Sequence, residues 1–149
     1  VHPDSETEEK DLENLKRKID AGADRAITQF FFENDVFLRF RDKAVSAGIS
    51  VPIIPGILPV TNFNKIKNIA NKVSALIPDW LDNKFEGVEN DLEACQSIAM
   101  DFNGNQILEL KREGVKNFHF YTMNKSELIS ELCNLIGISQ TICLHSETI

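Results

Sequence analysis

The sequence predicts an α/β protein built on a parallel β-sheet. A helical pattern, a glycine and a buried-strand pattern follow one another three times, in DAGADRAITQF, SAGISVPIIPG and REGVKNFHFYT. Glycine lets the chain leave a helix and turn into a strand. No segment has the pattern of a tight antiparallel hairpin. The three joints are therefore expected to connect helices to strands of one parallel sheet.

The chain begins with a predicted helix followed by a predicted strand. Leu12, Leu15 and Ile19 recur at helical spacing and indicate a helix over residues 6–21, with Gly22 at its C-terminal cap. The apolar run RAITQFF that follows is typical of a strand buried on both faces.

The next elements are a helix, a strand and a third helix. Residues 33–35, Glu-Asn-Asp, supply turn and N-cap chemistry for a helix over 35–47, which Gly48 ends. VPIIPGI is the second strand, and its Pro-Gly pair is expected to end it sharply. The helix after LPVTN has an apolar face made of Phe63, Ile66, Ile69, Ala70 and Val73.

The rest of the chain predicts two more strands and two more helices. SALIP is a weaker strand candidate that Pro78 stops, and a polar, acidic segment follows it. A long helix is expected over about 89–112, with Gly104 as a weak point. VKNFHFYT is the last clear strand, and a helix over 125–136 follows it. The tail, residues 139–149, has no periodicity.

Four parallel strands are compatible with two architectures. They can form a small open sheet, or half of an eight-stranded barrel. A complete (β/α)8 barrel takes about 250 residues, so a chain of 149 residues is about half a barrel long. The pattern alone leaves both architectures open.

Composition excludes several classes of function. The net charge of −7 argues against nucleic acid as a partner, because binding phosphates needs a basic surface. The longest apolar run is too short for a membrane helix, and the start of the chain does not resemble a signal peptide. Cys95, Cys133 and Cys143 have no metal-like spacing and are expected to be reduced thiols of a cytoplasmic protein.

In both architectures, ligands bind at the carboxyl ends of the strands. That edge is expected to carry Thr28, Gln29, Pro55, Gly56 and the segment 121–124. None of these residues is a nucleophile with an adjacent base, and the chain has no GxGxxG pattern or metal-binding cluster. His119, within the last strand, is expected to be a neutral, hydrogen-bonded core residue.

The first helix has a polar face opposite its apolar stripe. At 100° per residue, Asp11, Asn14, Arg17 and Lys18 fall within about 120° of arc. Such a face is compatible with an ordinary solvated surface. It is also compatible with a site for an anionic, hydroxyl-rich ligand, whose phosphates the cations would bind and whose hydroxyls the carboxylate and amide would bind.

Four segments together carry a resemblance to a known family. They are VHP, DLENLKRKIDAGADRAITQFFFEND, FRDKAVSAGISVPIIPGILPVTNF and REGVKNFHFYTMNK. From Val1 to about Ile138 the chain resembles the C-terminal half of bacterial methylenetetrahydrofolate reductases, with 139–149 as a loose tail. The resemblance implies a (β/α)8 TIM barrel, of which this chain supplies about the last four β/α units. It also implies a flavoprotein that passes a hydride from NAD(P)H to FAD and then to methylenetetrahydrofolate, giving methyltetrahydrofolate.

The resemblance also assigns roles to individual residues. The positions that match the family's FAD site are His2, Ser5, Asp11, Asn14, Arg17 and Lys18. Gln29 matches a residue that contacts the folate pterin or the nicotinamide, and Lys65 and Lys125 match further substrate-binding positions. Lys65 stands where the enteric pattern has Gln, Lys125 where it has Arg, and Ile69 where it has an aromatic residue.

The family's general acid, a Glu, and the Asp beside its flavin belong to the N-terminal half of the barrel. The chain alone is therefore expected to be inactive, and the complete enzyme is expected to be a homo-oligomer, as family members commonly are. Two other functions remain compatible with the residues. One is a different folate- or phosphate-binding barrel enzyme, and the other is a half-barrel that only binds flavin or dimerises.

Overall fold

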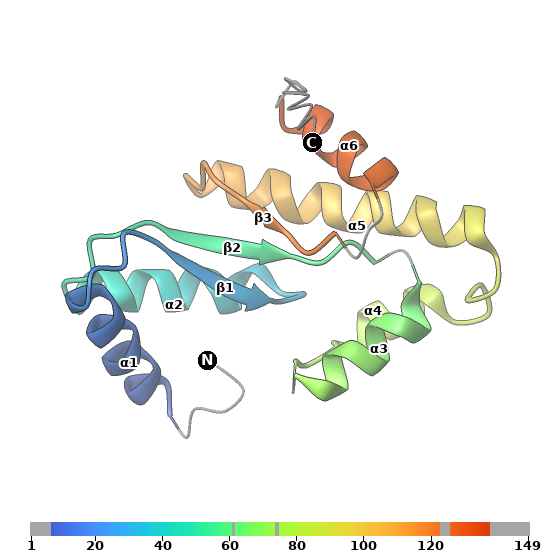
Figure 1. Ribbon diagram of the computed structural model, residues 1–149. Helices are drawn as coiled ribbons and strands as arrows, with labels where there is room; N and C mark the ends of the chain where they lie inside the picture. The colour runs from blue at the N-terminus through green and yellow to red at the C-terminus, as the bar shows by residue number, and fades with distance from the viewer. Residues whose placement is uncertain (1–6, 61, 74, 123–125, 138–149) are drawn as a thin grey trace, which may run out of the picture.

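The computed structural model describes residues 7–60, 62–73, 75–122 and 126–137. Within these residues the chain forms a three-stranded sheet and six helices (Figure 1). Their order is α1 (Glu8–Asp20), β1 (Ala26–Phe30), α2 (Asn34–Ser46), β2 (Ile53–Ile57), α3 (Phe63–Lys72), α4 (Asp79–Phe85), α5 (Leu92–Arg112), β3 (His119–Phe120) and α6 (Ser126–Leu135). No helix among the described residues is both long and apolar enough to cross a membrane.

The sheet is parallel, as predicted, and its strand order β1-β2-β3 follows the chain. The joints before the three strands contain Gly22, Gly48 and Gly114, whose φ angles are 106°, 82° and 85°. These left-handed values are easily reached only by glycine. The helix–glycine–strand prediction is therefore confirmed at all three joints.

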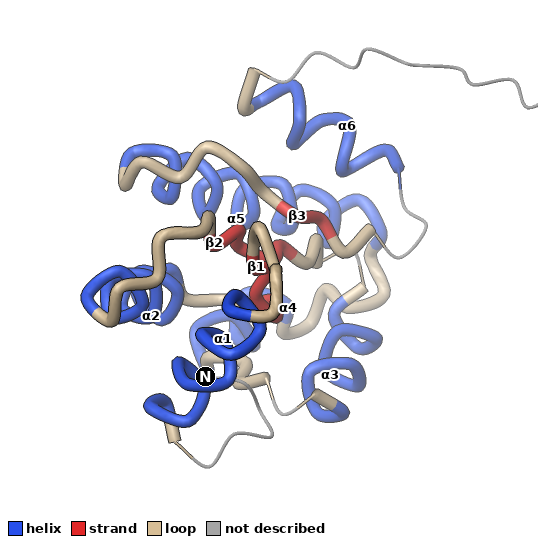
Figure 2. Tube along the Cα trace, turned by 60° about the vertical axis from the view of Figure 1, so that its left-hand side comes forward, coloured by secondary structure: helices blue, strands red, loops and turns tan. Residues whose placement is uncertain are grey.

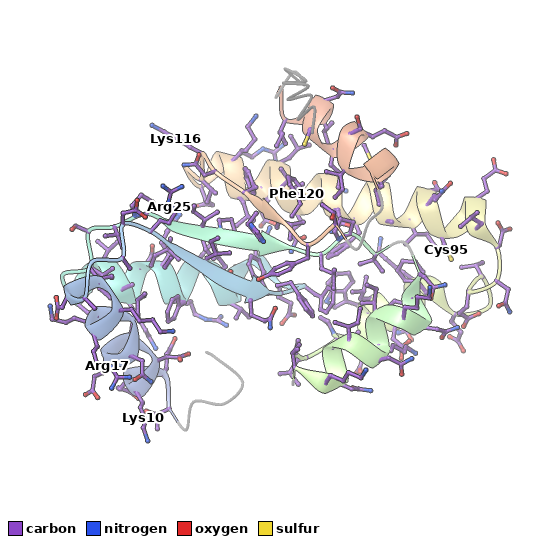
Figure 3. All side chains as sticks on the ribbon, in the orientation of Figure 1. Lys10, Arg17, Arg25, Cys95, Lys116 and Phe120 are labelled. Atoms are coloured by element: carbon purple, nitrogen blue, oxygen red, sulfur yellow. The ribbon has the colours of Figure 1, made fainter. Side chains whose placement is uncertain are left out.

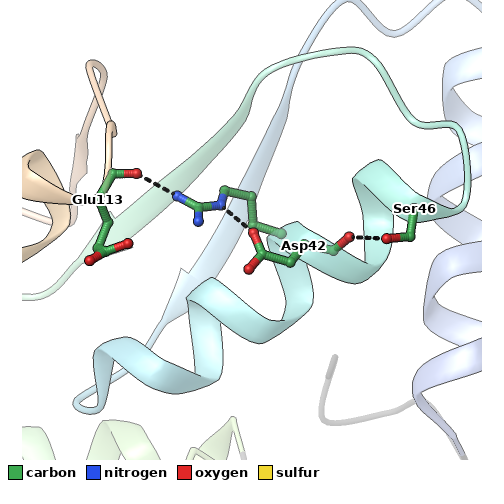
Figure 4. A network of polar contacts seen from close by, with 4 residues as sticks. Asp42, Ser46 and Glu113 are labelled. Atoms are coloured by element: carbon green, nitrogen blue, oxygen red, sulfur yellow. Dashed lines mark hydrogen bonds and ion pairs between the residues drawn. The ribbon is translucent and has the colours of Figure 1, made fainter.

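Two of the helices between consecutive strands, α2 and α5, pack together on one side of the sheet. Figure 1 shows α2 and α5 running behind the strands, and Figure 2 shows the strands in the middle of the helices. Arg41 of α2 ties these two helices together, because its Nη1 donates to the carbonyl of Glu113 at the end of α5, 2.8 Å away (Figure 4). Repeated right-handed crossovers in the same direction produce such a one-sided layer.

Gly104 is a contact site in α5, where the sequence indicated only a weak point. A Cβ at this position would lie 3.0 Å from Cδ2 of Leu135 in α6. The missing side chain therefore allows α6 to pack closely on α5. The intact α5 spans 21 residues, so the long helix expected over 89–112 is confirmed with a slightly later start.

The strand predicted at SALIP is wrong, since residues 75–78 are not in a strand. β2 pairs directly with β3, which leaves no position for a strand between them. Leu76 is 90% exposed, so the run lacks the burial that a central strand requires. The sheet accordingly has three strands in the described residues, one fewer than the four that the sequence predicted.

Helix α4 was not expected, because its sequence DWLDNKF is short and mostly polar. Leu81 and Phe85 lie one turn apart on this helix, and both are fully buried. The ring of Phe85 stacks on that of Phe63 in α3, with 4.5 Å between the ring centroids. Two apolar residues at helical spacing thus suffice to hold this short helix against the core.

Three further details differ from the sequence predictions. β1 is not buried on both faces, because no described element covers the side of Ile27, which is 48% exposed. The Pro-Gly pair lies inside β2 and does not end it. Helix α2 has Glu33 at its N-cap position without a side-chain cap bond, since Asn34 turns its amide toward α5.

Candidate functional site

The carboxyl ends of the three parallel strands meet at one edge of the sheet. Gln29 lies at the end of β1, Gly56 near the end of β2, and Tyr121 directly after β3. The structure therefore brings together the residues expected at this edge, as far as Thr122. Met123 and Asn124 lie outside the described residues.

A β-bulge forms where β1 reaches this edge. Ile27 pairs with Ile54 and Phe30 with Gly56, so Thr28 and Gln29 both stand opposite Pro55. Proline has no N–H to donate to a neighbouring strand, and in a central strand it is tolerated mainly at bulges. Bulges redirect side chains and are common beside active sites. Pro55 thus accounts for the irregularity that sets the direction of Gln29.

The amide of Gln29 is held from one side only. Its Oε1 accepts a hydrogen bond from the backbone N–H of Phe30, 3.1 Å away. Within the described residues its Nε2 has no protein acceptor. A half-buried carboxamide with its oxygen bonded and its NH2 group available can donate to an acceptor of a ligand at this edge.

Thr28 and Tyr121 bind the bulge to the other two strands. Oγ1 of Thr28 accepts from the N–H of Gly56 at 3.0 Å, and the phenol of Tyr121 donates to the Thr28 carbonyl at 3.1 Å. Burial raises the pKa of the Tyr121 phenol above its usual value, so the phenol stays a neutral donor at physiological pH. The ring of His119, which is half-buried, meets the Tyr121 ring edge to face, with 4.9 Å between the ring centroids.

A buried polar network in α5 supports the loops at the same edge. Asn103 is fully buried, and its Oδ1 accepts from the N–H of Val60 at 3.2 Å while its Nδ2 donates to the carbonyl of Leu58 at 3.4 Å. Nε2 of Gln106 donates to the carbonyl of Phe31 at 2.9 Å. These bonds hold the segments that follow β1 and β2.

The sequence analysis missed this network. The signal was present, because Asn103 and Gln106 are polar residues one turn apart among the apolar positions of α5. Amides on the buried face of a helix indicate hydrogen bonds to backbone groups of another element. The groups they serve come from distant loops, and no local pattern reveals them.

A hollow of about 510 Å³ lies between α2, α4 and α5, apart from Gln29 and Tyr121. Asn34 lines it and donates through Nδ2 to the carbonyl of Gln106 and to a carboxylate oxygen of Glu109, 3.1 and 2.6 Å away. The Oδ1 atom of Asn34 is buried without a hydrogen-bond partner. Trp80 forms part of the wall and is 41% exposed.

The polar face predicted on the first helix is present on α1. Asp11 and Asn14 are half-buried, Arg17 and Lys18 are exposed, and Nη2 of Arg17 donates to Oδ1 of Asn14 at 3.1 Å. Figure 3 shows Arg17 projecting from this helix. This donor set fits a phosphate- and hydroxyl-bearing group such as FAD, because both cations and the Asn14 amide lie on one surface. His2 and Ser5 lie outside the described residues.

The predicted substrate residues are not all brought together. Lys65 lies in the first turn of α3, where its backbone N–H donates to the Asn62 cap at 2.9 Å and its side chain is exposed. Among the described residues no hydrogen bond joins its side chain to Gln29. Lys125 lies outside the described residues. Ile69 is partly buried against the core, on the apolar face of α3.

Comparison with known proteins gives one consistent result. The family model "Methylenetetrahydrofolate reductase" matches residues 1–137. The 5,10-methylenetetrahydrofolate reductases of Salmonella typhimurium and Escherichia coli are 50% and 49% identical over 138 residues, which is 93% of this chain. The chain spans 47% of the length of each of these relatives. Methylenetetrahydrofolate reductase (NADH) 1 of Arabidopsis thaliana is 34% identical over 143 residues.

A solved structure shares the fold. It is an uncharacterized protein from Clostridium thermocellum, described as binding two copies of 5-methyl-5,6,7,8-tetrahydrofolic acid. The likeness has a TM-score of 0.54, covers 85% of this chain and 47% of that chain, and comes with 19% sequence identity. At 19% identity, this similarity shows a shared backbone fold and no more.

Proposed function

Because this chain belongs to the methylenetetrahydrofolate reductase family, we propose that it is the C-terminal part of an enzyme that reduces 5,10-methylenetetrahydrofolate to 5-methyltetrahydrofolate. The observation that carries the proposal is the family match over residues 1–137, together with identities of 49–50% to two bacterial reductases. A fold alone would not support a particular reaction. The agreement extends over nearly the whole chain, including the edge where Gln29 lies.

The enzyme that contains this chain is proposed to be a (β/α)8 barrel. Three features support this architecture: the strand order follows the chain, helices α2 and α5 lie on one side of the sheet, and β1 and β3 each have one open edge among the described strands. Open edges are normally covered or paired. The other half of the barrel would pair with both edges and cover the exposed face at Ile27.

FAD is the proposed cofactor, and when bound it would relay a hydride equivalent from NAD(P)H to the folate. In this chain, α1 is the element that would hold it. Arg17 and Lys18 would bind its phosphates, and Asp11 and Asn14 its hydroxyls. Asn14 fixes the guanidinium of Arg17 by a hydrogen bond, which reduces the freedom that this side chain would lose on binding.

Gln29 is proposed to orient the ring that reacts, either the pterin of the folate or the nicotinamide. Its Nε2 is the available donor, because its Oε1 is occupied by the N–H of Phe30. An amide binds a ring carbonyl without placing a negative charge where hydride arrives. Lys65 and Lys125 are proposed to contact the more distant, anionic part of the substrate, as point charges without the bidentate geometry of arginine.

The complete enzyme is proposed to be a cytoplasmic homo-oligomer. The free thiols of Cys95 and Cys133 support a reducing compartment. Its catalytic acid is proposed to lie in the N-terminal half, since among the described residues no carboxylic acid is hydrogen-bonded to Gln29.

Anaerobic spectroscopy of the purified full-length protein tests this function. We expect flavin absorbance after purification, bleaching by NADH or NADPH, and recovery of the absorbance when methylenetetrahydrofolate is added. A colourless protein would contradict the flavin proposal. A flavin that NADH or NADPH does not bleach, or that folate does not reoxidise, would contradict a reductase and favour another barrel enzyme.

A further inference from the structure

We propose that Tyr121 is a positioning residue that holds the β1 bulge and thereby sets the direction of the Gln29 amide. The inference rests on the proposed function, in which Gln29 contacts the reacting ring. It adds a residue from a different strand, whose phenol would act on the substrate only through Gln29.

Tyr121 connects two strands that are not neighbours. Its backbone N–H donates to the carbonyl of Ile57 at 2.9 Å, which continues the pairing of β3 with β2. Its side chain then crosses β2 and donates to the carbonyl of Thr28 in β1 at 3.1 Å. Within the described residues, the hydrogen bond from the Tyr121 phenol to the Thr28 carbonyl links the segment after β3 to the bulge in β1.

The crossing depends on the absence of a side chain at Gly56. A Cβ built there would lie 2.5 Å from the Thr28 carbonyl oxygen and 2.7 Å from Cε2 of Tyr121. Both distances are too short for any side chain without movement of the backbone or of the ring. Gly56 therefore has a local role, which is to let the Tyr121 ring approach the central strand closely.

The ring of Tyr121 is also fixed from the sides. The rings of Phe30 and His119 meet it edge to face, at interplanar angles of 77° and 80°. With the ring held, the phenol is directed at the Thr28 carbonyl, to which it donates. Its partial burial keeps it protonated and able to donate.

The bonds at Thr28 explain how this contact reaches Gln29. The carbonyl of Thr28 belongs to the peptide group whose N–H is that of Gln29. The Tyr121 phenol binds this carbonyl, and the Gly56 N–H binds the Thr28 hydroxyl. Without the phenol, the peptide that enters Gln29 would lose its bond to the segment after β3, at a bulge where the regular pairing of β1 with β2 is already interrupted.

The test uses the full-length enzyme with the variants Tyr121→Phe, Gln29→Ala and their combination. Tyr121→Phe keeps the ring and removes the hydrogen bond, and we expect kcat/KM for methylenetetrahydrofolate to fall about tenfold. The matched control is Ser46→Ala, which removes a hydroxyl–carbonyl hydrogen bond of 2.8 Å to Asp42, away from the site. The kcat/KM of this control is expected to stay within about twofold of that of the unmodified enzyme.

The double variant distinguishes positioning from general stability. If Tyr121 acts through Gln29, the combined variant will have the same kcat/KM as Gln29→Ala, because nothing remains to be positioned. If the fold-losses of kcat/KM in the two single variants multiply in the double variant, the inference is overturned. A Tyr121→Phe variant whose kcat/KM equals that of the Ser46→Ala control would also overturn it.

Crystal structures of the unmodified full-length protein and of its Tyr121→Phe variant decide the inference independently of turnover. A Gln29 carboxamide that has moved or lost its order in the variant supports it, and an unmoved carboxamide overturns it. Absence of folate reduction in the unmodified enzyme would contradict the proposed function, while these two structures would still test the role of Tyr121.

Discussion

Replacing Asn103 with alanine tests whether the polar network of α5 holds the edge of the sheet where the candidate site lies. Asn103 is fully buried and connects α5 to the segment after β2. The alanine variant removes the acceptor of the Val60 N–H, 3.2 Å away, and the donor to the Leu58 carbonyl, 3.4 Å away. Val60 and Leu58 are themselves buried, at 0% and 2% exposure, so water cannot easily replace these bonds.

The expected loss of stability follows from these groups. An orphaned buried N–H costs about 1–3 kcal/mol, and loss of the longer bond to Leu58 costs roughly 0.5–1 kcal/mol. The total is about 2–4 kcal/mol, including the small void that the amide leaves. For a domain of 150–250 residues, 1 kcal/mol lowers Tm by about 2–4 °C. We therefore expect a decrease in Tm of roughly 4 °C or more.

Asn105→Ala is the matched control. Asn105 lies on the same helix and is exposed, and its Nδ2 donates to the carboxylate of Asp101, 3.0 Å away. Exposed substitutions of this kind change stability by about 0.5 kcal/mol or less. Both variants would be measured in the full-length protein by thermal unfolding at the same concentration. Equal Tm values for Asn103→Ala and Asn105→Ala would refute the assigned role of the network.

Three further predictions concern the bulge, the cofactor surface and the open edges. Gly56→Ala should destabilise the full-length protein by about 1–3 kcal/mol, as overpacking does, and should displace the Tyr121 ring; unchanged thermal unfolding together with an unmoved ring would contradict this. Arg17→Gln should weaken FAD binding by about tenfold, the value of one charge-assisted bond, whereas Lys16→Gln, which lies outside the polar face of α1 and pairs with Asp20, should not; equal flavin affinities in a titration would argue against α1 as the phosphate site. The isolated 149-residue chain should give no NAD(P)H-dependent folate reduction, because the edges of β1 and β3 are unpaired; turnover by the purified chain would refute this.

The sequence was sufficient to predict those parts of the fold that depend on local patterns. The joints at Gly22, Gly48 and Gly114 were predictable, because a helix, a glycine and an apolar run leave few alternatives. The run SALIP misled because a short apolar run does not show whether a strand has a neighbour. Because β2 pairs directly with β3, the sheet has no place between them for a strand at SALIP.

The candidate site was predictable in position but not in construction. The end of β1 was expected to meet the ends of the other strands, and it does. Pro55 in a central strand was a signal for a bulge, but it was interpreted as the end of the strand. The bond from Tyr121 to Thr28 joins residues 93 positions apart, and no periodicity in the sequence contains that information.

The most direct test of the proposed reductase function is the rate of folate-dependent flavin reoxidation in Gln29→Glu of the full-length enzyme. This substitution keeps the size of the side chain, removes its donor and adds a negative charge beside the reacting ring. The same change at the exposed Gln96 of α5 is the control. We predict that Gln29→Glu retains bound flavin but reoxidises it with methylenetetrahydrofolate at least about tenfold more slowly, which corresponds to about 1.4 kcal/mol of transition-state stabilisation. Normal reoxidation, or loss of the flavin, would contradict the account.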